Sequence, residues 1–200
     1  MEPLLKGILA GITISLMVGP IFLALADITM SKGWRSGLAY VFGVIVSDII
    51  LIYCIETLLQ QFPFDNELKQ KIGLIGGVLL MVFGVVTYLA RSNLKAVDVT
   101  SVKTIMGAIL KGVTINIFNP FVTVWWITMY STISIQYNSN SDKFLFYFGI
   151  LWMVFLFDLL KMKFAYYLKQ RLTLQNLGYL KKIVGVCLFL FGIGMIVKVI

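Results

Sequence analysis

The stretch ILAGITIS at residues 8–15 aligns without a gap with ILKGVTIN at residues 109–116. A proline follows each stretch within five residues, in the dipeptides Gly19-Pro20 and Asn119-Pro120. A proline inside a helix removes one backbone donor, and its ring clashes with the preceding turn. Two apolar segments far apart in the chain are therefore expected to be helices that break at corresponding positions.

The likeness continues beyond these segments. Phe42-Gly43 corresponds to Phe148-Gly149, and an acidic residue follows each pair, Asp48 in the first half and Asp158 in the second. Chance likeness between apolar helices is the alternative, but an ungapped match that ends just before a proline favours an internal duplication. Further matching glycines are Gly77 and Gly84 in the first half and Gly185 and Gly192 in the second.

The composition is typical of a membrane protein. Of the 200 residues, 60% are apolar and 13% are charged, whereas soluble domains carry about 25% charged residues. A bilayer-spanning helix needs roughly 20 mostly apolar residues, so six spans leave no room for a soluble catalytic domain. The predicted spans are residues 4–29, 38–61, 72–90, 109–135, 144–167 and 183–200.

Each half of the internal duplication contains three predicted spans. Because this number is odd, the second half must enter the membrane from the side opposite to the first. We therefore predict an all-α integral membrane protein with six transmembrane helices as an inverted 3+3 repeat, in which helices 1 and 4 are broken by proline. Residues 1–200 form a single transmembrane domain, with repeat one at about 1–95 and repeat two at about 104–200. Interrupted helices at corresponding positions of inverted repeats indicate the binding site of a secondary transporter.

Basic residues predict the orientation. The first, third and fifth connections, with the adjoining span ends, hold most of the positive charge, and by the positive-inside rule they face the cytoplasm, so that both termini face outward. Ala24-Leu25-Ala26 also resembles a signal cleavage site, but the likeness of the first span to the fourth favours a retained span. The basic residues on the predicted inner side are Lys32, Arg35, Arg91, Lys95, Lys103, Lys111, Lys161, Lys163, Lys169, Arg171, Lys181 and Lys182, and those on the outer side are Lys6, Lys69, Lys71, Lys143 and Lys198.

The broken helices predict a binding site. A half-helix N-terminus is partly positive and suits a carboxylate, and the carbonyls that the prolines release, those of Leu16 and Asn116, suit an ammonium group. An amino acid carries both groups. A plain proline kink packed by Ser15, Asn116 and Asn119 is the structural alternative. The predicted substrate-binding residues are Gly19, Pro20, Asp48, Asn116, Asn119 and Pro120.

Three ionisable residues are candidates for proton coupling. Asp48 lies about 15 Å into the second span, near the middle of a core about 30 Å thick. A carboxylate there should be paired, protonated or in contact with water. Asp158 and Lys161 are three residues apart on one helix face, where they can form an ion pair. A purely structural acid and a structural ion pair are the alternatives for these positions.

Other function classes find less support. The chain has no histidine and only two cysteines, Cys54 and Cys187, so a thiol–disulfide carrier, a soft-metal exporter or an intramembrane hydrolase lacks its usual residues. No phosphate-binding loop or metal-ligand cluster is recognisable, and the net charge of +8 fits a membrane surface rather than nucleic acid. We predict a transporter and no enzyme, with no cofactor and no metal. A soft-metal or other solute exporter and a non-transporting scaffold remain as alternatives.

The chain resembles the small bacterial exporters of the lysine exporter type, the LysE and RhtB relatives. The likeness rests on Gly19-Pro20, on Gly43 to Asp48, on Asn119-Pro120 and on Phe157 to Lys161. It implies proton-driven export of amino acids or similar metabolites across the bacterial cytoplasmic membrane, with a homodimer as an option. Family members often carry Asn or Gln just after Gly-Pro, whereas Ile21-Phe22 stands here. This difference leaves open a more apolar amino acid or a different metabolite as the substrate.

Overall fold

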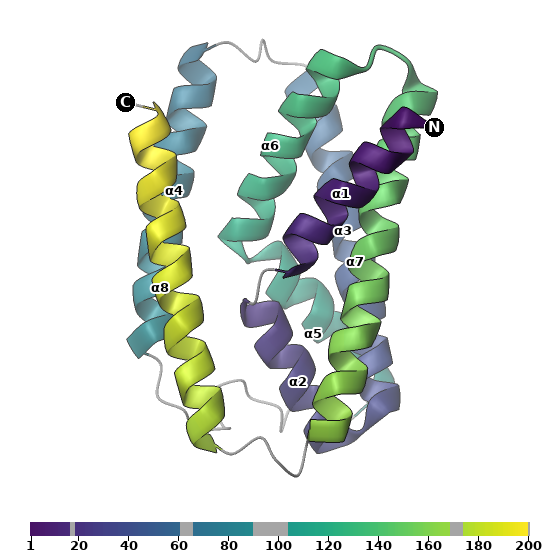
Figure 1. The fold of residues 1–200 in the computed structure, drawn as a ribbon, viewed down its shortest axis with the longest axis vertical. Helices are drawn as coiled ribbons and strands as arrows, with labels where there is room; N and C mark the ends of the chain where they lie inside the picture. Colours follow the sequence, from purple (N-terminus) through teal and green to yellow (C-terminus); the bar gives the residue numbers. More distant parts are fainter. Residues whose placement is uncertain (17–18, 61–65, 90–103, 169–173, 200) are drawn as a thin grey trace.

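All regular elements in the described part of the chain are helices. The computed structural model describes residues 1–16, 19–60, 66–89, 104–168 and 174–199. Of the basic residues used to predict the orientation, Arg91, Lys95, Lys103, Lys169 and Arg171 lie outside these ranges, and the orientation stays a prediction. The helices are α1 (Glu2–Leu16), α2 (Pro20–Lys32), α3 (Trp34–Gln60), α4 (Asn66–Leu89), α5 (Ile105–Ile117), α6 (Pro120–Gln136), α7 (Asn140–Leu168) and α8 (Leu174–Val199) (Figure 1).

The helices divide into long spans and bent pairs. In the described residues, α3 and α7 are each long and apolar enough to cross a membrane. The pairs α1–α2 and α5–α6 meet the same requirement only when each pair counts as one span, and they bend by 70° and 65°. In α4 and α8 the apolar parts are the shorter segments Gly73–Leu89 and Lys182–Val197. The structure thus contains two to four candidate spans, and six spans stay a prediction.

The two prolines begin new helices instead of kinking continuous ones. Pro20 and Pro120 each occupy the first turn of their helix, α2 and α6, where the missing N–H has no intrahelical role. The carbonyl of Asn116, which we expected to be free, accepts a hydrogen bond of 3.1 Å from the backbone N–H of Asn119. That expectation was wrong because α5 closes with a tight turn before α6 starts. The carbonyl of Leu16 precedes residues 17–18, which lie outside the described ranges.

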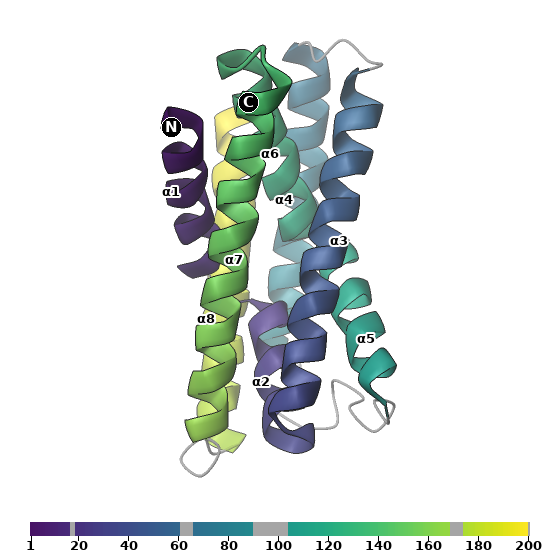
Figure 2. The ribbon, with the colours of Figure 1, turned by 90° about the vertical axis from the view of Figure 1, so that its right-hand side faces the viewer.

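Glycines bring α4 and α8 into backbone contact. A Cβ atom on Gly84 would lie 2.7 Å from the carbonyl oxygen of Gly185, and one on Gly185 would lie 2.7 Å from the carbonyl oxygen of Gly84. Gly77 and Gly192 form a second reciprocal contact of the same kind. Small residues allow such close approach between membrane helices, where packing replaces the hydrophobic effect as the driving force. The helices α4 and α8 therefore run side by side along the molecule (Figures 1 and 2).

The half-helices α5 and α1 pack closely on the two long helices. Gly112 of α5 lies against the backbone of Tyr40 in α3, and Gly11 of α1 lies against the backbone of Ile150 in α7. Gly11 and Gly112 are the two glycines that the sequence alignment pairs. Each half-helix therefore packs on the long helix of the other half of the chain, α1 on α7 and α5 on α3 (Figure 2).

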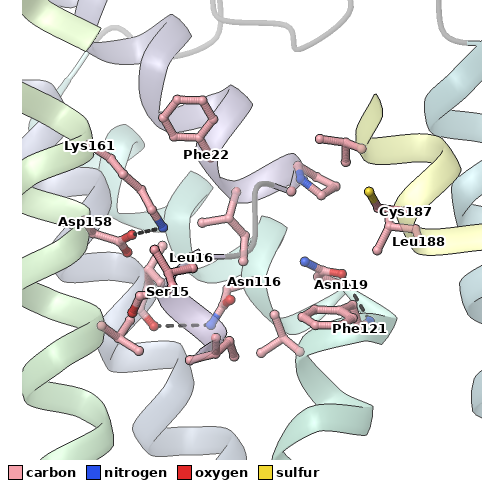
Figure 3. Close-up of a pocket in the computed structure, with 18 of the residues that line it drawn as sticks. Ser15, Leu16, Phe22, Asn116, Asn119, Phe121, Asp158, Lys161, Cys187 and Leu188 are labelled. Atoms are coloured by element: carbon pink, nitrogen blue, oxygen red, sulfur yellow. Dashed lines mark hydrogen bonds and ion pairs between the residues drawn. The ribbon is translucent and has the colours of Figure 1, made fainter. Parts of the chain in front are cut away.

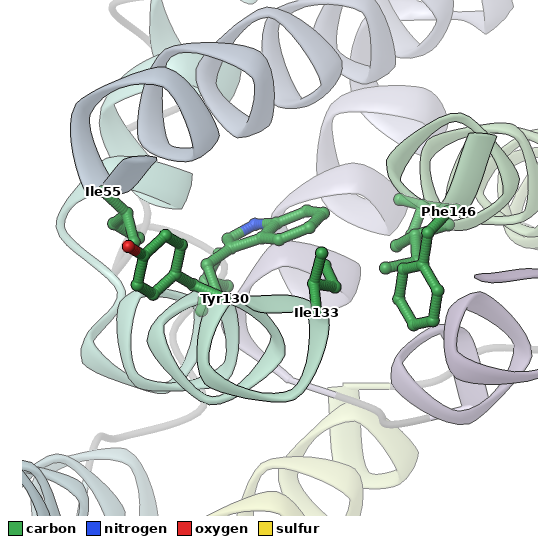
Figure 4. Packing of buried hydrophobic residues seen from close by; sticks show 8 residues of the cluster. Ile55, Tyr130, Ile133 and Phe146 are labelled. Atoms are coloured by element: carbon green, nitrogen blue, oxygen red, sulfur yellow. The ribbon is translucent and has the colours of Figure 1, made fainter. Parts of the chain in front are cut away.

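An apolar cluster holds α6 between α3 and α7. The cluster takes one face of α6, because its members on that helix recur at intervals of three or four residues. This packing fixes the rotation of α6 and so decides which of its side chains face the centre of the molecule (Figure 4). The buried members are Ile55 of α3, Val122, Trp126, Tyr130 and Ile133 of α6, and Phe146, Ile150 and Val154 of α7.

The outer surface is strongly apolar. On α4 alone, Leu74, Ile75, Val78, Leu79 and Val82 are exposed. A contiguous apolar patch of this kind is rare on soluble monomers. In a bilayer these side chains contact lipid, which agrees with the membrane character of the composition.

The glycine contact between α4 and α8 gives a test of the packing. Gly185→Ala places a methyl group against the backbone of α4 and should lower the free energy of unfolding by about 1–3 kcal/mol. Gly194→Ala on the same helix is the matched control, because no described atom lies within 4 Å of the added Cβ. Thermal unfolding in detergent measures both. An equal effect of the two substitutions on the melting temperature would contradict the packing described here.

Candidate functional site

A cavity of about 330 Å³ lies where the two bent helix pairs break. Its size is at the lower end of the range for small-molecule sites, about 300–1,000 Å³. Four helices (α1, α3, α5 and α7) and the capping residue before α6 contribute polar or charged lining residues, and α8 contributes mainly apolar ones. The polar and charged lining residues are Ser15 of α1, Asp48 of α3, Asn116 of α5, Asn119 before α6, and Asp158 and Lys161 of α7 (Figure 3).

Asp48 lies at the junction of three helices. Its side chain is 4% exposed. Its Oδ1 atom accepts one hydrogen bond of 2.7 Å from Asn116 Nδ2 and one of 2.9 Å from the indole N–H of Trp126. Since both donors are neutral, Asp48 gains hydrogen bonds from them but no opposite charge. A buried carboxylate held in this way is costly to keep ionised, so the site suits a group that binds a cation or exchanges a proton.

Asn116 connects the end of α5 to α3. Besides its bond to Asp48, its Nδ2 atom lies 2.6 Å from Ser47 Oγ and 3.3 Å from the carbonyl oxygen of Val44. The close contact of Gly112 with Tyr40, one turn earlier in α5, brings Asn116 within reach of these partners. The amide of Asn116 therefore stabilises both the helix end and the position of the Asp48 carboxylate.

Asp158 and Lys161 form the ion pair that their spacing on α7 allows. Lys161 Nζ lies 3.0 Å from Asp158 Oδ1, and the two side chains are 20% and 5% exposed, respectively. The pair lines the same cavity as Asp48 (Figure 3). The cavity therefore contains two carboxylates and one ammonium group at its lining, so its formal charge is negative when all three are ionised.

The predicted binding residues meet in this cavity, with one exception. Gly19 and Pro20 line it at the start of α2, and Asn116 and Asn119 line it at the break between α5 and α6. Pro120 is not among the lining residues. At the first position of α6, its ring takes part in starting the helix. The structure gives the positions of these residues. Their roles in binding and proton coupling stay predictions.

Trp126 is the site residue that sequence reasoning missed. Tryptophans in apolar spans are typical packing residues or interfacial anchors, and the sequence favours this interpretation for both Trp125 and Trp126. Trp126 does pack in the apolar cluster, with 1% of its surface exposed, but its N–H also donates to Asp48. A usable signal existed, because an indole N–H buried in an apolar environment needs an acceptor. The choice between the two tryptophans depends on the rotation of α6, which the sequence does not state.

Within the described ranges, no group of three or more Cys, Asp or Glu side chains is placed to hold a metal ion. Cys187 of α8 lines the cavity, and both Cys187 and Cys54 of α3 are exposed. The cysteine in the cavity therefore stands among apolar neighbours of α8, and the soft-metal alternative gains no ligand cluster from the described part of the chain.

A family comparison assigns the chain. The model of the LysE type translocator family matches residues 12–199, which is nearly the whole chain. No curated protein and no solved structure matches it. The family match confirms the resemblance inferred from the sequence motifs.

The hydrogen bond between Trp126 and Asp48 gives a second test. Trp126→Phe keeps an aromatic ring but removes the N–H donor, so it should lower the free energy of unfolding by about 1–2 kcal/mol. Trp125→Phe is the matched control, since its ring is a neighbour of Trp126 and its indole donates to no described residue. Unfolding by heat or denaturant in detergent compares the two. A larger loss for Trp125→Phe would show that the Asp48 contact is not the stabilising one.

Proposed function

This chain belongs to the LysE type translocator family, and we propose that it is a secondary active transporter that exports amino acids or related small metabolites, coupled to proton entry. One observation carries the proposal: Asp48 and Asp158 line a single cavity at the breaks of both bent helix pairs. A transporter needs a polar site within the membrane that its two halves form together. Ionisable groups at membrane depth are expensive and usually serve the transported species or its coupling ion.

The architecture we propose is six spans in an inverted 3+3 repeat. The repeats are residues 1–95 and 104–200, approximately, in one transmembrane domain. Support comes from the reciprocal packing, in which α1 contacts α7 while α5 contacts α3. The reciprocal glycine contacts between α4 and α8 agree with a two-fold axis that passes between these helices. Alternating access would then move one half against the other around the cavity.

Each ionisable residue has a proposed role. Asp48 binds the ammonium group of the substrate or exchanges it for a proton, since its present partners are neutral donors. Asp158 and Lys161 act as a second element of the coupling, because protonation of Asp158 would release Lys161 from the ion pair. Gly19, Pro20, Asn116 and Asn119 frame the substrate where the helices break.

The proposed location is the bacterial cytoplasmic membrane. The bias of basic residues supports an orientation with both termini outside the cytoplasm. A homodimer is proposed on the family resemblance alone. None of these three features affects the test of transport that follows.

Transport can be tested directly with the full chain in lipid vesicles. Vesicles loaded with unlabelled amino acids should accumulate the same labelled amino acid by counterflow. An imposed proton gradient should drive net movement, and collapse of the gradient with a protonophore should stop it. Lack of exchange across a broad panel of amino acids and small metabolites would contradict the proposed function.

Asp48 is the most informative residue for this assay. Asp48→Asn keeps the shape and most hydrogen bonding but removes the ionisable group, so gradient-driven transport should fall at least tenfold, about the change that 1.4 kcal/mol produces. Asp142→Asn is the matched control, because Asp142 lies in the first turn of α7 and does not line the cavity. Initial rates at equal protein density measure the effect. Wild-type transport rates in Asp48→Asn would contradict a role of Asp48 in binding or coupling and would leave it a structural role alone.

A further inference from the structure

The two half-helix N-termini at the cavity differ in one chemical respect. At α6 the side chain of Asn119 caps the helix, since its Oδ1 atom accepts a hydrogen bond of 3.2 Å from the backbone N–H of Phe121. At α2 the capping residue is Gly19, which has no side chain, and in the described residues no other side chain takes its place. A side chain therefore satisfies one donor of the α6 terminus, whereas no side chain of the described residues does so at α2.

The first turn of α2 lines the cavity. The first N–H groups of a helix have no intrahelical partner, and Pro20 has none to offer, so the donors are those of Ile21 and Phe22. The four consecutive residues from Gly19 to Phe22 all line the cavity. A helix N-terminus carries a partial positive charge and binds anionic groups through such donors. The start of α2 is thus chemically suited to a carboxylate.

Ser15 supplies a second and independent observation. Its side chain is 3% exposed and lines the same cavity, and its Oγ atom has no hydrogen-bond partner among the described residues. Serine in a helix commonly donates to a carbonyl one turn earlier, and a buried hydroxyl without a partner costs free energy. In the view of Figure 3, Ser15 lies between Asp158 and Asn116. An acceptor on the substrate would provide the missing partner.

We propose that the N-terminus of α2 and Ser15 Oγ together form the subsite for the carboxylate of the transported amino acid. This inference rests on the proposed function and adds to it which of the two broken helices binds the carboxylate. Among the described lining residues, Asp48 and Asp158 outnumber the one lysine, Lys161, which disfavours a ligand that is only anionic and favours a zwitterion.

The apolar wall indicates the class of side chain. Val184, Leu188 and Phe191 recur on one face of α8, and all three line the cavity. A charged substrate side chain would lose its hydration against this wall without gaining a partner. The substrate class is therefore a zwitterionic amino acid with an uncharged, apolar side chain.

A substitution that copies the cap of α6 onto α2 tests the subsite. Gly19 has extended φ and ψ values of −139° and −171°, and no described atom lies within 4 Å of an added Cβ. Gly19→Asn should therefore place an oxygen on the open donors, as Asn119 does at α6. Gly19→Ala is the matched comparison, because it adds the same Cβ without the oxygen.

The assay uses counterflow in vesicles with alanine, valine, leucine, methionine and phenylalanine as probes. For the amino acid that moves fastest, the competitor is the amine with the same side chain and no carboxylate. In the wild-type protein the amine should compete at least tenfold less well than the amino acid. The apparent affinity of Gly19→Asn for the amino acid should be about tenfold lower than that of Gly19→Ala, with no such difference for the amine.

Stability separates a blocked site from a misfolded protein. A cap stabilises its helix, so Gly19→Asn should unfold at a temperature no lower than that of Gly19→Ala. If Gly19→Asn does not fold, Ser15→Ala replaces it, and should weaken binding of the amino acid about tenfold but not that of the amine. Removal of an unpartnered hydroxyl should leave the melting temperature of Ser15→Ala unchanged or higher.

The outcomes distinguish this inference from the proposed function. No counterflow of any probe or of the broader panel would contradict the proposed function, and the subsite with it. Counterflow with equal affinities of Gly19→Asn and Gly19→Ala for the amino acid would overturn the subsite alone. Equal competition by the amine in the wild-type protein would overturn it as well.

Discussion

Every backbone polar group within a membrane must find a partner, and the two helix breaks of this protein are arranged around that requirement. At the break between α5 and α6, Asn119 closes the turn twice, once with its backbone N–H to Asn116 and once with its side chain to Phe121. At the start of α2 the capping residue is a glycine, which offers no side-chain acceptor, and the first turn of the helix lines a cavity. The two helices that begin at corresponding breaks therefore differ, because a side chain caps α6 and none of the described side chains caps α2.

Close packing keeps the breaks in position. Glycines bring α1 onto α7 and α5 onto α3, so each half-helix is held by a long helix rather than by its own continuation. The apolar cluster around Trp126 then fixes the rotation of α6. As a result, hydrogen-bond donors from α5 and α6 meet at Asp48 on α3. The hydrogen bonds of this carboxylate link the three helices, because within lipid the hydrophobic effect does little to drive helices together.

Much of this arrangement was predictable from local patterns. Apolar runs predicted the helices, and prolines at matching positions predicted the two breaks. The ungapped match between residues 8–15 and 109–116 paired Gly11 with Gly112, which occupy similar contacts in the structure. The motifs also indicated the family, which the comparison confirmed. The number of spans was predicted as six, and the described helices support two to four by length and composition.

The sequence by itself determined that this is a membrane protein, in what order its helices follow one another and which residues could bear charge within the membrane. These properties depend on composition and on spacing along one helix, so they can be read without knowing any neighbour. Only the tertiary structure decided that Trp126 rather than Trp125 reaches Asp48, that Pro120 stays out of the cavity, and that Asn119 caps its helix while Gly19 does not. Such choices depend on the rotation of each helix against its neighbours, which packing between residues far apart in the chain decides.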